Sequence, residues 1–132
     1  MPERTLTPAA VILAVAAGGA VGAVARWLAE RATLALLDAE PVATLIVNVV
    51  GCLLMGVLVA RVLGGSVRWP LARPFFGTGV LGGFTTFSAY SADAVVLARD
   101  GAPILAGAYV LGTLLLCLGA VWLGGRIGQV RV

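Results

Sequence analysis

The stretch from Gly77 to Ser91 carries the residues of this chain that are best suited to chemistry. Four glycines at its start precede a group of hydroxyls and aromatic rings, in the order Gly-Thr-Gly-Val-Leu-Gly-Gly-Phe-Thr-Thr-Phe-Ser-Ala-Tyr-Ser. Each glycine weakens a helix by roughly 1 kcal/mol relative to alanine. Inside a membrane, an interrupted helix persists only where its freed backbone groups are buried in protein or line a polar cavity. We predict such an interruption here, and a plain packing face of small residues is the simpler alternative.

Two other polar residues lie within or at the edge of apolar segments. Asn48 is the only asparagine of the chain, and a buried amide needs hydrogen-bond partners. Its side chain can bond a neighbouring helix, or its NH2 group can donate to an anion. Arg26 ends the first apolar segment beside Trp27. It either reaches toward lipid headgroups or raises the anion concentration in a water-filled vestibule. The residues alone leave both alternatives open.

The last apolar segment carries a second polar pattern. Tyr109, Thr113 and Cys117 are spaced by four, which stacks them on one helical face. The two hydroxyls either form a stripe along a pore or bond back to the preceding turn. Cys52 is the other cysteine, and neither has a Cys-x-x-Cys spacing or a histidine nearby. We interpret both as free packing cysteines.

Composition indicates an integral membrane protein. The chain has 132 residues, of which 61% are hydrophobic and 11% are charged, against about 25% charged in soluble domains. A helical span needs about 20 apolar residues. We predict one all-α domain over residues 1–132 whose four spans cover about 9–27, 42–60, 75–98 and 104–123, the first of them a retained span and not a signal peptide. No nucleophile–base pair or metal-ligand cluster indicates an enzyme.

The arginines indicate an orientation. All nine basic residues are arginines, and four spans place both termini on one side of the membrane. That side holds six of them, namely Arg4, Arg61, Arg68, Arg73, Arg126 and Arg131. The positive-inside rule therefore predicts that both termini and the connection 61–74 are cytoplasmic, in the cell membrane.

Three motifs resemble those of the Fluc family of fluoride channels, also called CrcB-like proteins. The first span carries Gly18-Gly19-x-x-Gly22-x-x-x-Arg26, and the second carries Thr44-Leu45-x-Val47-Asn48-x-x-Gly51. The third span carries Gly82-Gly83-Phe84-Thr85-Thr86-Phe87-Ser88. Each motif alone is weak, but three in this order on four spans make a specific signal over nearly the whole chain.

The resemblance implies an antiparallel dimer of four-helix subunits whose third helix is broken at mid-membrane. It also implies two pores along the subunit interfaces and a structural sodium ion on the two-fold axis that is not transported. By motif position, the backbone carbonyls of Gly82 and Thr85 would hold this ion. The chemistry is reasonable because a hard cation prefers oxygen ligands and a helix break frees carbonyl groups.

The resemblance further implies a pore that exports fluoride passively and so lowers cytoplasmic fluoride. The family's aromatic pair corresponds to Phe87 and Tyr90, whose ring edges can face an anion. Arg26 would set the potential of the vestibule. Hydrogen-bond donors that replace water around fluoride would come from Asn48, Thr86, Ser88, Tyr109 and Thr113.

The chain departs from the family pattern in two ways. Ala89-Tyr90 stands where the family usually has Thr-Phe, so one hydroxyl is missing and the second ring gains one. The loop charge is also strongly biased, whereas subunits that insert in both orientations need nearly balanced loops. We therefore hypothesise a fixed orientation and a dimer with an oppositely oriented paralogue. A second copy of this chain is the alternative partner.

Two other functions are compatible with four short spans. A proton-coupled multidrug transporter of this size needs a titratable group at membrane depth, usually a carboxylate. The acids nearest to a span are Glu30, Asp93 and Asp100, and each lies close to a predicted boundary. The second alternative is a non-conducting assembly subunit, which is consistent with the many small residues.

Overall fold

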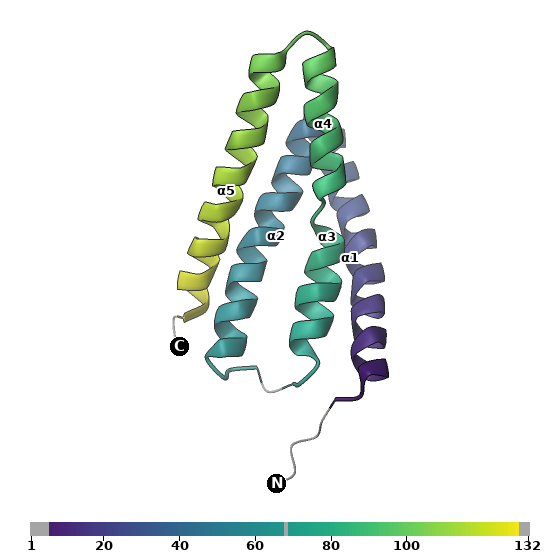
Figure 1. Cartoon of the computed structure of the whole chain (residues 1–132), viewed down its shortest axis with the longest axis vertical. Coiled ribbons are helices and arrows are strands. Elements are labelled where there is room, and N and C mark those ends of the chain that lie inside the picture. Colours follow the sequence, from purple (N-terminus) through teal and green to yellow (C-terminus); the bar gives the residue numbers. More distant parts are fainter. Residues whose placement is uncertain (1–5, 68, 130–132) are drawn as a thin grey trace.

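The structure, a computed structural model, describes residues 6–67 and 69–129. Its elements, in chain order, are α1 Pro8–Leu37, α2 Glu40–Leu63, the π-helix η1 Arg73–Leu81, α3 Gly82–Phe84, α4 Phe87–Arg99 and α5 Pro103–Gln129 (Figure 1). Four helical stretches are long and apolar enough to cross a membrane, with η1, α3 and α4 together forming the third. The described residues contain no strand. The prediction of an all-α chain with four spans is confirmed.

A sharp turn joins α1 and α2. The first helix begins after Thr7, whose side chain accepts a hydrogen bond from the Ala10 amide, and it continues without a break to Leu37. Asp38 then adopts a left-handed backbone conformation with φ 47°, and its N–H donates to the carbonyl of Leu34. Such a residue ends a helix because it turns the chain out of the helical path. The second helix starts two residues later.

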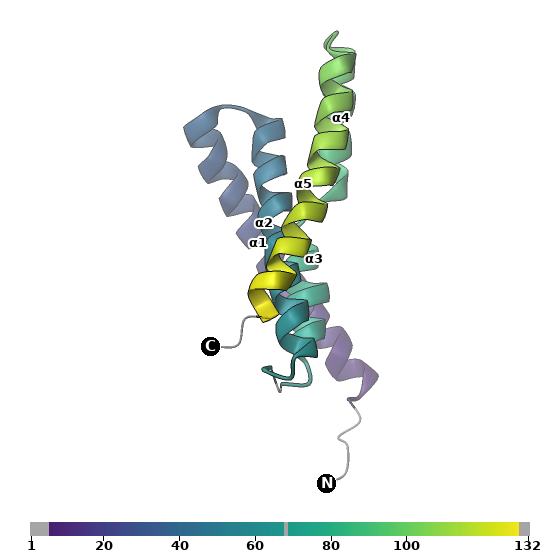
Figure 2. The same cartoon turned by 90° about the vertical axis from the view of Figure 1, so that its left-hand side faces the viewer.

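The four spans run alternately up and down. The start of α1, the connection between α2 and η1, and the end of α5 lie at one end of the molecule (Figure 1). At the other end, the α1–α2 turn leans away from the α4–α5 turn (Figure 2). A cavity of about 180 Å³ lies between α1, α2 and α4, with Glu30, Glu40 and Asp93 among its lining residues.

Glycines bring α2 and α5 into backbone contact. A Cβ atom on Gly56 would collide with the carbonyl oxygen of Val121, and one on Gly124 would collide with that of Leu53. Gly128 lies against Ala60 in the same way. Small residues permit such close approach of membrane helices, where van der Waals packing drives association.

The glycine-rich motif of the third span remains helical and packs against α1. Gly79 and Gly83 face Gly18 and Gly19 of α1, and a Cβ atom on Gly22 would collide with the carbonyl oxygen of Val80. The N–H of Gly82 reaches back five residues to the carbonyl of Gly77, the pattern of a π-helix. The helix interruption predicted from these glycines does not occur at the glycines themselves, because close packing against α1 keeps them helical.

We expect Gly124→Ala to destabilise the protein by about 1–3 kcal/mol, because the new methyl group meets a backbone oxygen that only a helix shift can relieve. Gly125→Ala is the matched control, since its Cβ would meet nothing within 4 Å. Denaturation of the purified variants in mixed micelles measures the difference. Equal stability of the two variants would contradict the packing described here.

Candidate functional site

Two extended residues interrupt the third span. Thr85 has φ −80° and ψ 156°, and Thr86 has φ −143° and ψ 126°, so α3 ends at Phe84 and α4 begins at Phe87. The Thr85 hydroxyl donates to the carbonyl of Leu81 at 2.9 Å, which closes the end of α3. The Thr86 side chain accepts a hydrogen bond from the Ala89 amide at 3.2 Å and caps α4. Each half-helix is therefore terminated by a threonine of the break.

Asn48 holds the break from α2. Its Oδ1 accepts a hydrogen bond from the Thr86 N–H at 2.8 Å, and its Nδ2 donates to the Thr86 carbonyl at 2.9 Å. Both residues are buried, with 7% of Asn48 and 8% of Thr86 exposed. An amide side chain can satisfy a donor and an acceptor of one extended residue at once, as a neighbouring β-strand would. The two hydrogen bonds fix the conformation of the break at a buried position, where water is not available to bond the Thr86 backbone.

The break withdraws the usual hydrogen-bond donors from two carbonyl groups. In a continuous α-helix the Gly82 carbonyl would accept from the Thr86 N–H, and the Thr85 carbonyl from the Ala89 N–H. Here the Thr86 N–H donates to Asn48, and the Ala89 N–H donates to the Thr86 hydroxyl. The oxygens of Gly82 and Thr85 are therefore available to another electropositive group. These are the two carbonyls for which the family resemblance implies a sodium ion.

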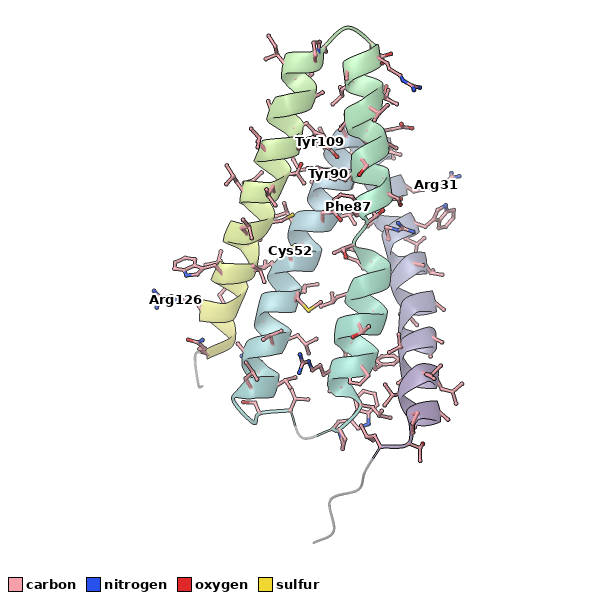
Figure 3. All side chains as sticks on the ribbon, in the orientation of Figure 1. Arg31, Cys52, Phe87, Tyr90, Tyr109 and Arg126 are labelled. Carbon is pink, nitrogen blue, oxygen red and sulfur yellow. The ribbon has the colours of Figure 1, made fainter. Side chains whose placement is uncertain are left out.

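Aromatic rings gather directly beyond the break. The ring centroids of Phe87 and Tyr90 are 5.6 Å apart, and those of Tyr90 and Tyr109 are also 5.6 Å apart. Figure 3 shows the three labelled residues following one another along the α4–α5 hairpin. The predicted pore residues Phe87, Tyr90 and Tyr109 thus belong to one cluster.

The two tyrosine hydroxyls already have acceptors within the chain. Tyr90 donates to the carbonyl of Val110 at 3.0 Å, and Tyr109 donates to Oδ2 of Asp93 at 3.2 Å. A phenol has a single proton to donate. In this arrangement their oxygens face other groups only as acceptors. The sequence places Asp93 close to a span boundary, whereas in the structure it lies within α4 and accepts the hydrogen bond of Tyr109. A carboxylate inside an apolar segment is the signal that could have identified this role.

A cavity of about 270 Å³ lies beside the break, between α2, α4 and α5. Six of the predicted site residues line it, together with both cysteines; they are Asn48, Thr85, Thr86, Phe87, Tyr90 and Thr113. Thr113 is 5% exposed, and its hydroxyl has no hydrogen-bond partner among the described residues. A buried hydroxyl without a hydrogen-bond partner costs free energy. A hydrogen bond from Thr113 to a small polar ligand would therefore be stabilising.

Other predicted residues lie on the outer surface of the single chain. Phe87 exposes 79% of its surface, and Gly82 and Ser88 are also exposed. The Ser88 hydroxyl lies 3.2 Å from that of Thr86. Arg26 is half-buried on α1 and does not line the cavity beside the break. The single chain thus forms one wall of the site and leaves part of it open.

The fold and the site define a small multi-pass α-helical membrane protein whose polar groups converge on a broken span, as in ion channels and transporters. Residues 13–125 match the family model described as "CrcB-like protein, Camphor Resistance (CrcB)". The chain belongs to this family. It is therefore not an enzyme, and the resemblance inferred from the three motifs is confirmed.

Curated relatives share the name "Fluoride-specific ion channel FluC". One from Cereibacter sphaeroides is 53% identical over 100 residues, which cover 75% of this chain and 78% of the relative. One from Rhodospirillum centenum is 48% identical over 117 residues, covering 86% and 91%. "Fluoride-specific ion channel FluC 1" of Streptomyces coelicolor is 44% identical over 117 residues, covering 89% and 76%.

Proposed function

We propose that this protein is a fluoride-selective channel that lets fluoride leave the cell passively. The observation that carries the proposal is the Asn48-held break, which faces a cavity lined by a free hydroxyl and by aromatic rings. Fluoride is a small anion that accepts strong hydrogen bonds, and charge-assisted bonds of this kind are the shortest and strongest. Thr113 and the second N–H of Asn48 supply donors, while the edges of Phe87 and Tyr90 supply positive potential.

We propose further that a structural sodium ion binds the carbonyl oxygens of Gly82 and Thr85. The support is the withdrawal of both α-helical donors, together with the preference of hard cations for oxygen. Gly82 is exposed, so a second subunit that meets it can supply the remaining oxygens. When bound, the ion would neutralise the partial charges that the freed carbonyls bring together.

We propose an antiparallel dimer, because one chain leaves the site open. Phe87 and Ser88 are exposed on the single chain, and a second subunit that covers them would close the pore. The bias of the loop arginines favours a single orientation with a cytoplasmic position for the chain ends and the 61–74 connection. Three arginines of that set lie in described segments: Arg61 in the last turn of α2, Arg73 at the start of η1 and Arg126 in the last turn of α5. An oppositely oriented paralogue is therefore the favoured partner over a second copy.

The test of the proposed function is halide efflux from liposomes that contain this chain alone, monitored with fluoride and chloride electrodes. We expect fluoride efflux well above that of empty vesicles once this chain is reconstituted with an oppositely oriented partner, and no chloride efflux above the same background. Fluoride efflux from the chain alone would show that a second copy is the partner; if the chain alone gives none, the same assay with a co-produced paralogue follows. Absence of fluoride flux in both preparations would reject the channel and favour a non-conducting assembly subunit.

We expect Phe87→Ile to reduce fluoride flux about two- to tenfold, because an aliphatic side chain loses both the positive ring edge and the ring pair with Tyr90. Aromatic pairs of this kind are worth about 0.5–1.5 kcal/mol. Phe76→Ile is the control, since Phe76 belongs to a separate aromatic cluster with Trp69 and Phe75. Both variants are compared in the efflux assay at equal reconstituted protein. A full rate for Phe87→Ile would exclude its ring from the fluoride path.

A further inference from the structure

Cys52 and Cys117 occupy matching positions on α2 and α5. These helices run in the same direction, and residues spaced by four on each form a regular ladder across the contact. Asn48 and Cys52 of α2 line one cavity with Thr113 and Cys117 of α5, and Gly56 lies against Val121 one turn further along both helices. The cysteines therefore lie one helical turn from the polar pair of Asn48 and Thr113.

The two thiols are neighbours in the same cavity. Cys52 on α2 and Cys117 on α5 both line the 270 Å³ space beside the break. Both are free and half-buried, so an incoming group can reach the sulfur atoms from the cavity. The chain contains no other cysteine and no histidine. No competing thiol or imidazole exists on this subunit.

We propose that Cys52 and Cys117 form a binding site for a thiophilic metal cation that takes two ligands, with Hg²⁺ as the probe. Two sulfur atoms from two helices suffice for such a cation, whereas Zn²⁺ usually needs four ligands. Among the described residues, no group of three metal-ligating side chains surrounds the pair. The donor set therefore selects a soft cation of low coordination number.

The reaction is balanced without an oxidant. Each thiol loses its proton to water, both sulfurs bond to the metal, and the product is a neutral S–Hg–S bridge with release of two protons. Neutrality matters because a buried net charge in an apolar span is costly. The bridge ties α2 to α5 next to Asn48 and Thr113. A metal held there would narrow the cavity that we propose for fluoride.

The primary test follows metal binding and does not depend on transport. Purified protein in detergent is titrated with HgCl2 while S-to-Hg absorption and remaining free thiols are measured. We expect saturation at one Hg²⁺ per chain with loss of both thiols. Because the second bond forms within one molecule, Cys52→Ser and Cys117→Ser should each bind about 100-fold more weakly in competition with free cysteine.

Two controls define the bridge. Methylmercury makes only one bond to sulfur, so it should label the two thiols separately, at two equivalents per chain. A non-reducing gel should show the Hg²⁺-treated chain at monomer size, which excludes a bridge between subunits. Saturation of the parent at two Hg²⁺ per chain, equal affinity in the single-cysteine variants, or a cross-linked dimer would each overturn the proposal.

A second measurement rests on the proposed function and can fail separately. Fluoride efflux from liposomes is recorded before and after one equivalent of HgCl2, and each variant is normalised to its own untreated rate. We expect the parent to lose most of its flux and the double Ser variant to keep its own rate. If absorption shows that the bridge has formed while the fluoride flux persists, the result would support the metal site and reject this cavity as the fluoride path.

Discussion

Asn48→Ala should reduce fluoride flux by at least about 100-fold. The substitution removes the acceptor of the Thr86 N–H and the donor to the Thr86 carbonyl, both of which are buried. Each buried backbone group without a partner costs roughly 1–3 kcal/mol, and 1.4 kcal/mol corresponds to a tenfold change. The break then loses the conformation that presents its carbonyl and hydroxyl oxygens. Efflux from liposomes at matched protein content gives the measurement.

Two further variants separate the clamp from the donor function of Asn48. Asn48→Asp keeps the acceptor for the Thr86 N–H but replaces Nδ2, which donates to the Thr86 carbonyl and carries the N–H proposed for fluoride, by a carboxyl oxygen. It should retain more stability than Asn48→Ala while still failing to conduct. Val50→Ala, on an exposed part of the same helix, should conduct at the parental rate. A parental rate for Asn48→Ala would show that the break needs no support from α2.

Removal of sodium should also abolish fluoride flux. We expect this result after exhaustive dialysis into N-methyl-D-glucamine buffer, because the freed oxygens of Gly82 and Thr85 then lack an electropositive partner. Each uncompensated carbonyl costs roughly 1–3 kcal/mol. Re-addition of sodium, but not of the larger potassium ion, should restore the rate. The liposome assay with both salts and the same fluoride gradient measures the effect.

Thermal unfolding provides a check on sodium that does not depend on conduction. A cation that binds only the folded protein raises its stability by about 2.7 kcal/mol at 100 times the dissociation constant. Sodium should therefore raise the unfolding temperature of the detergent-solubilised protein, and potassium should not at equal ionic strength. Parental flux and an unchanged unfolding temperature without sodium would together reject the cation site.

Sequence reasoning located the third span's special region but not the position of its break. Glycine propensity pointed to Gly77–Gly83, whereas the helix continues through these residues and opens at Thr85 and Thr86. Propensity measures the cost of a helix in isolation, while packing against α1 holds the glycines helical. The break needs a hydrogen-bond partner for the Thr86 backbone, and that partner is the side-chain amide of Asn48, 38 residues away in the chain.

The role of Asn48 shows how contacts resolve alternatives that residue types leave open. Its amide was equally suited to an interhelical hydrogen bond and to donation to an anion. The structure shows the first, and one remaining N–H keeps the second as a proposal. The hydroxyls of Tyr90 and Tyr109 likewise looked equivalent to that of Thr113. Only the fold reveals that both phenols have acceptors and that the Thr113 hydroxyl has no partner among the described residues.

The sequence by itself determined the number of spans, the membrane environment and the family. These properties follow from composition, apolar length and local motifs, which depend on neighbouring residues alone. The tertiary structure decided where the third span opens, which oxygens it frees and which hydroxyl stays unpaired. Each of these depends on a hydrogen bond or a close contact between residues far apart in the chain. The local pattern of residue types does not show which distant residues will meet.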